Sequence, residues 1–378
     1  MKNPVKINIV AFNTPYPPDF GGSIDVFYKL KSLAEQGIRI ILHCYTYKTF
    51  RPQSELEQFC EKVFYYPRQK GLLHFFSCIP YIVSTRRSRK LLQNLKESGV
   101  PVLFEGLHTC GWLRHDNLAG QVKIVRMHNV EYRYYQELSR VTTHPVKKLF
   151  YFTEYLKLKQ YEKIISAANC IAAISASDQE YFKSRHPDSV LIPAFHQFSE
   201  ITSRTGIGSY FLYHGNLEVE ENQEVVEFLV NKVFRGIDIQ LVIAGKNPPL
   251  RIKRFQMENP GITIMANPSG IEMDRLISEA QGCIIPTFQA TGQKLKLLSS
   301  LYAGRFCIVN NKMVSGTGLE NLCITGETPE EFRTILKKFR NLPFSGAEIA
   351  RRERFLFKLF SNRINAEILI KKIESLQV

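Results

Sequence analysis

Short apolar runs alternate along the chain with segments in which apolar residues recur every three or four positions. Such runs, bounded by turn residues, are typical of strands buried on both faces of a parallel sheet, and the spacing between them is that of helices. In the first half, strands are predicted at 6–12, 38–45, 62–66, 100–104, 122–127, 170–174 and 190–193. The longest helical region, about 132–168, is interrupted near His144 and Pro145.

The same alternation restarts after residues 194–208, which are mixed polar, lack periodicity and are interpreted as a linker. Strands follow at 210–214, 239–244, 262–265, 283–286 and 306–309, and helices at 221–234, 271–280, 293–303, 329–340 and 346–376. Two such halves predict an α/β protein with two doubly wound Rossmann-like domains, 1–195 and 209–345, facing each other across a ligand cleft.

The segment 283–310 breaks a local rule at the start of its helix. Lys294 and Lys296 stand where the helix dipole is already positive, so cations are unfavourable there. Such a departure in a strand-to-helix loop indicates function. Free backbone N–H groups, Gly292 and the two lysines would together hold a phosphate. The alternative is a pair of solvated lysines on a surface helix.

Two further candidate sites follow predicted strands of the first half. Gly21 and Gly22 stand in the loop 14–23, after the first strand, where backbone N–H groups could approach an anion closely. His128 and Glu131 come directly after the strand 122–127, and ligands bind at the carboxyl ends of parallel strands. The alternatives are a plain helix-entry turn and a structural histidine.

The charge balance points to an anionic partner. The chain has 378 residues, a net charge of +15 and a pI of about 9.4. The basic residues are spread along the chain and no groove-reading motif is present, so a nucleic acid is not expected. The eight cysteines lie mostly in apolar runs without a CxxC motif, which excludes structural zinc and a disulfide framework. With neither a signal peptide nor a spanning segment, we expect a cytoplasmic protein.

One segment leaves a membrane contact open. It begins at Gly71 with an apolar, aromatic stretch and ends at Lys90 in a basic run. Apolar residues beside basic ones suit the surface of an anionic membrane, such as the inner face of the plasma membrane. The alternative is that the aromatic residues belong to the core and that the basic run is a solvated helix face.

Five segments carry a family resemblance: PYPPDFGGS, HNVE, YHGN, VIAG and GxKxKxLxxLxxG. In their order and spacing the chain resembles the group 1, retaining glycosyltransferases of the GT-B fold, which use nucleotide-sugar donors. The resemblance implies that the second domain binds the donor and the first the acceptor, with Glu131 on the acceptor side. It also implies that the last helix, within 346–378, returns to the first domain.

Carried over residue by residue, the resemblance assigns roles to the candidates. Gly21 and Gly22 would flank the donor phosphates, and His128 would lie beside the transferred sugar. The remaining donor-binding residues would be Gly215, Asn216, Gly292, Lys294, Lys296 and Ser299, with His128 and Lys294 taking part in catalysis.

The chain departs from the family pattern at two places. The family's two glutamates, seven residues apart, fall near Thr291 and at Ser299. Ser299 can still form a hydrogen bond with a ribose but carries no charge. The basic residues that usually follow the first strand of the second domain are replaced by Glu218, Glu220 and Glu221. The phosphate charge would then rest more heavily on Lys294 and Lys296.

The expected function is transfer of a hexose from a nucleoside-diphosphate sugar to a glycan or lipid-linked acceptor, with retention of configuration. The expected setting is the synthesis of a cell-surface polysaccharide or lipopolysaccharide. We expect no cofactor and no metal ion, because no aspartate-rich motif is present. The alternative is a catalytically weak GT-B module that binds a glycan or lipid acceptor as a scaffold.

Overall fold

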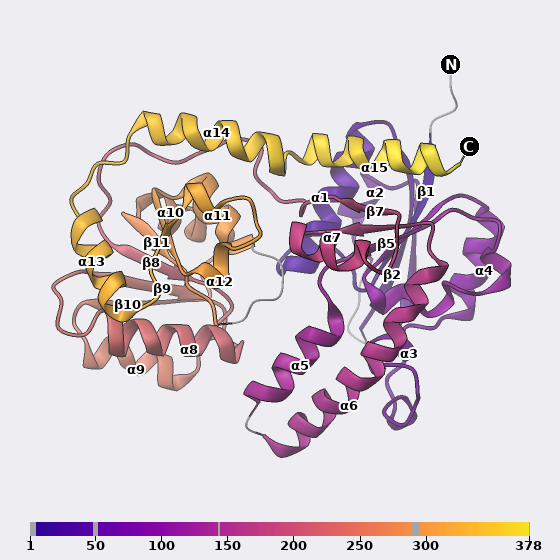
Figure 1. Cartoon of the computed structure of the whole chain (residues 1–378), viewed down its shortest axis with the longest axis horizontal. Coiled ribbons are helices and arrows are strands. Elements are labelled where there is room, and N and C mark those ends of the chain that lie inside the picture. Colours follow the sequence, from indigo (N-terminus) through magenta and orange to yellow (C-terminus); the bar gives the residue numbers. More distant parts are fainter. Residues whose placement is uncertain (1–4, 48–51, 143, 289–294, 378) are drawn as a thin grey trace. The chain divides into compact units, whose positions relative to one another are not determined.

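A computed structural model describes residues 5–47, 52–142, 144–288 and 295–377 as two compact units (Figure 1). Unit 1 contains the described residues up to Gln197 together with those from Phe360 onward. Unit 2 contains the described residues from Phe198 to Leu359. The first unit is therefore built from two separate stretches of the sequence.

Unit 1 is organised around a seven-stranded parallel sheet with the order β3-β2-β1-β4-β5-β6-β7. Its strands are β1 Lys6–Ala11, β2 Arg39–Thr46, β3 Lys62–Pro67, β4 Val102–Glu105, β5 Lys123–Met127, β6 Cys170–Ala173 and β7 Ser189–Leu191. They lie within a few residues of the predicted runs. The strand order reverses between β1 and β4, and this is where open parallel sheets bind ligands.

Helices cover both faces of this sheet (Figure 1). The described helices of unit 1 are α1 Gly21–Glu35, α2 Ser54–Glu57, η1 Leu72–His74, α3 Tyr81–Ser84, α4 Arg89–Ser98, η2 Leu107–Trp112, η3 Asp116–Leu118, α5 Glu131–Val141, α6 Pro145–Tyr161, η4 Glu162–Ala167, α7 Ala176–Lys183 and α15 Asn362–Leu376. The interruption predicted near Pro145 is present, because this proline begins α6. On one face, α15 packs against α1 and buries Leu369 and Ile373.

The beginning of α1 differs from the sequence prediction. Gly21 and Gly22 are the first two residues of the helix and not part of the preceding loop. The helix starts early because Ser23 Oγ accepts from Phe20 N (3.1 Å) and donates to Phe20 O (2.8 Å). A Cβ atom at position 22 would lie 2.5 Å from Cζ of Phe12, so a larger residue there would displace the Phe12 ring.

Unit 2 contains a six-stranded sheet with the order β10-β9-β8-β11-β12-β13. Its strands are β8 Phe211–His214, β9 Leu241–Gly245, β10 Ile262–Ala266, β11 Gly282–Ile284, β12 Phe306–Val309 and β13 Ile324–Thr325. Its helices are α8 Glu220–Phe228, the π-helical turn η5 Leu229–Val233, α9 Leu250–Glu258, α10 Gly270–Glu279, α11 Leu295–Ala303, α12 Asn311–Val314, η6 Glu320–Leu322, α13 Pro329–Phe339 and α14 Gly346–Phe360. The order reverses between β8 and β11.

Two connecting segments take forms that the hydrophobic pattern did not show. The expected linker packs onto unit 2: Thr202 N donates to Tyr302 O (2.8 Å), and Gly206 pairs with Phe344. The final helical segment is broken at Ser361, whose Oγ accepts from Ile364 N and caps α15.

Two of the four basic residues after the aromatic segment do not lie on a solvated face. Arg86 is buried and donates to Phe12 O (2.8 Å), just after β1, and to Ile82 O (2.7 Å), in α3. Arg87 lies 4.5 Å from the Trp112 ring centroid. Arg89 and Lys90 are the exposed members of the run. Among the described residues, no helix has the length and hydropathy to span a bilayer.

Candidate functional site

Five charged or titratable side chains gather at the point where the strand order of unit 1 reverses. Asp25 and Lys29 are one turn apart on α1, Glu105 is the last residue of β4, Arg126 lies in β5, and His128 follows β5. All five residues are buried. We refer to this set as the charged cluster.

The charged cluster is held together by short contacts. Lys29 Nζ lies 3.0 Å from Asp25 Oδ2 and 2.6 Å from Glu105 Oε1. Arg126 Nη2 lies 2.9 Å from Asp25 Oδ1, which also accepts from Phe195 N (2.8 Å). His128 Nε2 donates to Glu105 Oε2 at 2.9 Å, because an ionised carboxylate can only accept. Glu105 thus orients the imidazole ring of His128 and is itself held in place by Lys29.

Charge compensation keeps both carboxyl groups of the charged cluster ionised. Burial alone would raise the pKa of Asp25, but Arg126, Lys29 and His128 together hold it well below its usual range. The pKa of Glu105 is also lowered, because Lys29 and His128 outweigh the effect of burial. Two buried anions therefore face two buried cations, Lys29 and Arg126.

The charged cluster also contains the donor types of a metal site. Ligand atoms of Asp25, Glu105 and His128 lie within 4.8 Å of one another. Lys29 Nζ, however, already contacts both carboxylates, and a cation placed there would meet the ammonium and guanidinium charges at close range. The residues therefore fit a resident metal ion poorly.

Glu131 begins α5 and lies beside a second histidine. Burial raises the pKa of Glu131 to about 8. Its Oε1 is 3.7 Å from Nδ1 of His108, whose pKa burial and the charge of Arg86 hold well below the ordinary value. The rings of His108 and His128 both contact Phe12, with centroid distances of 5.1 and 5.5 Å. Gly22 approaches the same ring, so Gly22 and His128 meet at Phe12, and His108 connects Glu131 to it.

In unit 2, Lys296 lies where the strand order reverses. Its Nζ is 2.7 Å from Asn222 Oδ1 and 5.4 Å from the centroid of the Tyr213 ring. Asn222 Nδ2 in turn donates to Asn216 O (2.6 Å). A Cβ atom on Gly215 would lie 3.3 Å from Lys296 Nζ. Three of the predicted donor-binding residues are therefore neighbours.

The end of β9 approaches the turn after β8 closely and helps to hold this arrangement. A Cβ atom at Gly245, the last residue of β9, would lie 1.9 Å from Gly215 O. His214 Nε2 lies 3.0 Å from Ser300 Oγ, whose hydroxyl donates to Lys296 O (2.8 Å). Burial and the charge of Lys296 lower the pKa of His214 to about 3, so this imidazole is neutral and donates to the serine.

The hydroxyl group of Ser299 forms a hydrogen bond within its own helix. Its Oγ donates to Lys296 O (2.9 Å), within the first turn of α11. Gly292 and Lys294, and with them Thr291, lie outside the described residues, so their roles stay predictions.

The loop after β11 is fixed by partners that the sequence did not reveal. Thr287 N donates to Asn310 Oδ1 (3.0 Å), and Asn310 Nδ2 donates back to Thr287 O (2.8 Å). The Thr287 hydroxyl donates to Glu221 Oε1. Glu221 thus belongs to the same edge of the sheet as Lys296 and adds a negative group there.

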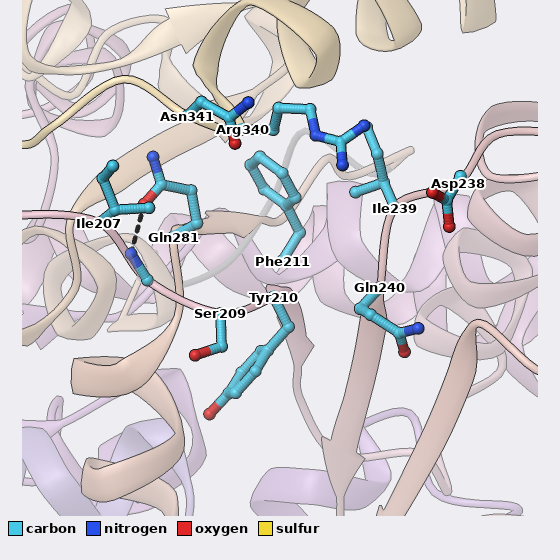
Figure 2. A pocket seen from close by; sticks show the side chains of 11 residues that line it. Ile207, Ser209, Tyr210, Phe211, Asp238, Ile239, Gln240, Gln281, Arg340 and Asn341 are labelled. Carbon is cyan, nitrogen blue, oxygen red and sulfur yellow. Dashed lines mark hydrogen bonds between the residues drawn. The ribbon is translucent and has the colours of Figure 1, made fainter.

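A pocket of about 200 Å³ opens at the opposite edge of the unit 2 sheet (Figure 2). Its lining includes Tyr210 and Phe211 at the start of β8, Gln240 before β9, and Gln281 before β11. The Gln281 side chain accepts from Gly208 N (2.6 Å) and donates to Leu342 O (2.8 Å), which ties three segments together. Because parallel sheets bind ligands at their carboxyl edges, this pocket is not the expected donor site.

The comparisons with known proteins bear on the fold. No family model matches the chain. It is 26% identical over 360 residues to an uncharacterized 44.6 kDa protein in the cps region of Klebsiella pneumoniae, covering 89% of this chain and 92% of that protein.

Solved structures match nearly the whole chain. Sucrose-phosphate synthase from Thermosynechococcus elongatus has a TM-score of 0.66 at 15% identity, covering 98% of this chain and 99% of that one. TarM has a TM-score of 0.68 at 8% identity, with coverages of 98% and 99%. HepE from Anabaena, in complex with UDP and glucose, has a TM-score of 0.64 at 10% identity, with coverages of 98% and 100%. The α/β class and the predicted GT-B fold, with two Rossmann-like units, are confirmed.

Proposed function

We propose that this protein is a retaining glycosyltransferase that moves a hexosyl group from a nucleoside-diphosphate sugar to a glycan or lipid-linked acceptor. The observation that carries the proposal is the grouping of Lys296, Gly215 and Asn216 at the reversal point of the unit 2 sheet. The GT-B fold and a structural neighbour with bound UDP and glucose support it. The relative in a cps region favours a role in polysaccharide synthesis.

In this proposal Lys296 stabilises the leaving diphosphate. The negative charge on that group grows as the glycosidic bond breaks, so a fixed cation lowers the barrier more than it strengthens ground-state binding. Its ammonium group is positioned by Asn222 Oδ1, at 2.7 Å, and lies 5.4 Å from the centroid of the Tyr213 ring. Lys294 and Gly292 would complete the phosphate-binding segment.

His128 is proposed to contact the transferred sugar from unit 1. Glu105 accepts from its Nε2 and so fixes the orientation of the imidazole ring. Glu131, with its raised pKa, would be protonated at neutral pH and could donate a hydrogen bond to an acceptor hydroxyl. The chemistry as proposed requires no metal ion, because lysine charge replaces it at the phosphates.

Nucleotide binding and its dependence on Lys296 test the proposal. Thermal melts against UDP, GDP, ADP, dTDP and CDP, each with magnesium and with EDTA, should show a selective shift with one base that survives EDTA. A ligand at about 100 times its Kd stabilises by roughly 2.7 kcal/mol, or on the order of 5–10 °C for a unit of this size. Lys296→Ala should abolish the shift, and the matched control Lys253→Ala, an exposed lysine on α9, should retain it.

A scaffold function is the second candidate. The family's ribose-binding glutamate is replaced by Ser299, whose hydroxyl donates to its own helix. If no nucleotide shifts the melting temperature while a glycan or lipid acceptor does, the protein binds acceptors without using a donor, and the transferase proposal is wrong.

A further inference from the structure

Helices α5 and α6 form an antiparallel hairpin of unit 1, drawn below the sheet in Figure 1. The outer side of α6 is apolar. Val146, Leu149, Phe152 and Leu156 follow one another at intervals of three or four residues, and their exposed fractions are 70%, 64%, 49% and 49%. This spacing places them on one face of the helix, where core side chains would normally be covered.

A second group of apolar side chains lies along one edge of this stripe. Leu72, Leu73 and Phe76, in and just after η1, are 77%, 86% and 85% exposed. Their loop is anchored on α6. The rings of Phe75 and Phe150 are 5.6 Å apart, and Lys157 Nζ donates to Phe75 O (2.8 Å). Because Phe150 and Lys157 directly follow Leu149 and Leu156, the loop runs beside the stripe. We call the seven exposed side chains and their surroundings the apolar face.

The charges around the apolar face are of one sign. Lys70, Lys147, Lys148 and Lys159 are exposed. The sequence contains no Asp or Glu between Glu61 and Glu97, nor between Glu137 and Glu154. Glu154 itself is buried, where it accepts from Tyr81 N (2.6 Å) and contacts Lys157 (3.0 Å). The surroundings of the apolar face are therefore basic.

From this arrangement we propose that the apolar face docks on the surface of an anionic lipid bilayer. Exposed apolar side chains gain free energy by entering the boundary between headgroups and acyl chains, and lysines around them gain by contact with anionic lipids. A protein partner would have to match these positive charges with acidic groups at fixed positions, whereas a negatively charged membrane supplies the complementary charge without a specific fit. The inference does not depend on the glycosyltransferase assignment, because it rests on a surface outside both candidate sites.

The structure changes which residues are expected to touch the membrane. Arg86 is buried and Arg87 stacks on Trp112, so neither belongs to the docking surface. The basic contribution instead comes from Lys70 and from the lysines of α6, a helix that the sequence did not connect with the aromatic segment. The contact is interfacial, with one face of a helix lying on the bilayer.

Vesicle flotation with the full chain tests this proposal. Vesicles of phosphatidylcholine alone should capture little protein, and vesicles that also contain phosphatidylglycerol should capture most of it at low salt. Lys148→Glu with Lys159→Glu, on the flank of the stripe, should lower the partition coefficient by more than tenfold, since each lysine near such a surface contributes about fivefold. The matched control, Lys253→Glu with Arg254→Glu on α9, also reverses two exposed charges of one helix and should leave binding nearly unchanged.

A second pair of variants isolates the apolar contribution. Leu149→Ser with Phe152→Ser should reduce capture severalfold, whereas Leu250→Ser with Met257→Ser, which changes two exposed side chains of unit 2, should not. These positions are exposed, so both proteins should fold, which circular dichroism would verify.

Two outcomes would overturn the proposal. One is failure of the wild type to bind anionic vesicles, and the other is equal binding by the variants of the apolar face and by the control variants. Self-association that Leu149→Ser with Phe152→Ser abolishes, without vesicle binding, would identify a protein interface instead.

Discussion

Replacing Lys29 by methionine would test whether the charged cluster is held together by its central ammonium group. The Lys29 side chain is fully buried and contacts two carboxylates at 3.0 and 2.6 Å. Lys29→Met keeps the length of the side chain but leaves Glu105 paired with His128 alone. Removing one partner of a buried ion pair costs about 3–5 kcal/mol, chiefly because the remaining charge is left uncompensated. For a unit of this size that loss lowers the melting temperature by roughly 6–20 °C.

Tryptophan fluorescence is a specific assay for this effect. The chain has one tryptophan, Trp112, which lies in unit 1 and contacts Arg87. Its emission during heating therefore follows the unit that contains the charged cluster. Lys31→Met is the matched control, because Lys31 lies on the same helix with a half-exposed side chain, 4.0 Å from Glu35. That change should shift the midpoint by about 2 °C or less.

The pH dependence separates lost charge compensation from simple repacking. In the wild type, the pKa of Glu105 is below its unfolded value, so its contribution to stability is present at neutral pH and is lost in acid. Without Lys29, burial dominates and raises that pKa above the unfolded value, so the folded variant takes up the proton first. The difference in melting temperature between Lys29→Met and the wild type should then decrease as the pH falls from 7 to 5. A difference below about 2 °C at pH 7, or one that does not change with pH, would refute the reasoning.

Two further changes test unit 2. Gly245→Ala should destabilise unit 2 by several kcal/mol, because its Cβ would lie 1.9 Å from Gly215 O; Gly270→Ala, which meets no neighbouring atom, is the control, and urea midpoints by circular dichroism would compare them. Burial and the charge of Lys296 lower the pKa of His214 to about 3. Below about pH 6.5 the unfolded state therefore binds more protons than the folded state, and the free energy of unfolding decreases as the pH is lowered. Between pH 7 and pH 5, the free energy of unfolding of His214→Gln should therefore fall by about 2 kcal/mol less than that of the wild type. The control His144→Gln, at an exposed position, should show the same fall as the wild type.

Most of the fold could be predicted from the sequence because strands buried on both faces of a parallel sheet are nearly continuous apolar runs. The run at β4, for example, is fully buried over its whole length, as is that at β5. The short elements α12 and β13 were not predicted, since four and two residues are too few to show a period. The early start of α1 was missed because a backbone-to-serine bond at Phe20, not an apolar pattern, determines it.

The candidate site was predictable only in part. Glycines, histidine and lysine after strands could be found from their positions, and the structure groups Gly215, Asn216 and Lys296. Apart from His128, the charged cluster was missed, because Asp25 and Lys29, four residues apart on a helix, have the spacing of an ordinary surface ion pair. Their partners Glu105 and Arg126 lie 76 and 101 residues away from them. A usable signal did exist, because a charge inside a doubly buried strand requires a partner.

The assignment of α15 to unit 1 has a consequence for how the protein is made. The apolar surface of α1 that packs against Leu369 and Ile373 is synthesised before unit 2, and the helix that covers it is synthesised after unit 2. Unit 2 can therefore finish folding while unit 1 still exposes this apolar surface. A chain truncated shortly before Asn362 would contain a complete unit 2 and a unit 1 that lacks α15. Aggregation during biogenesis should accordingly begin from the N-terminal part of the chain.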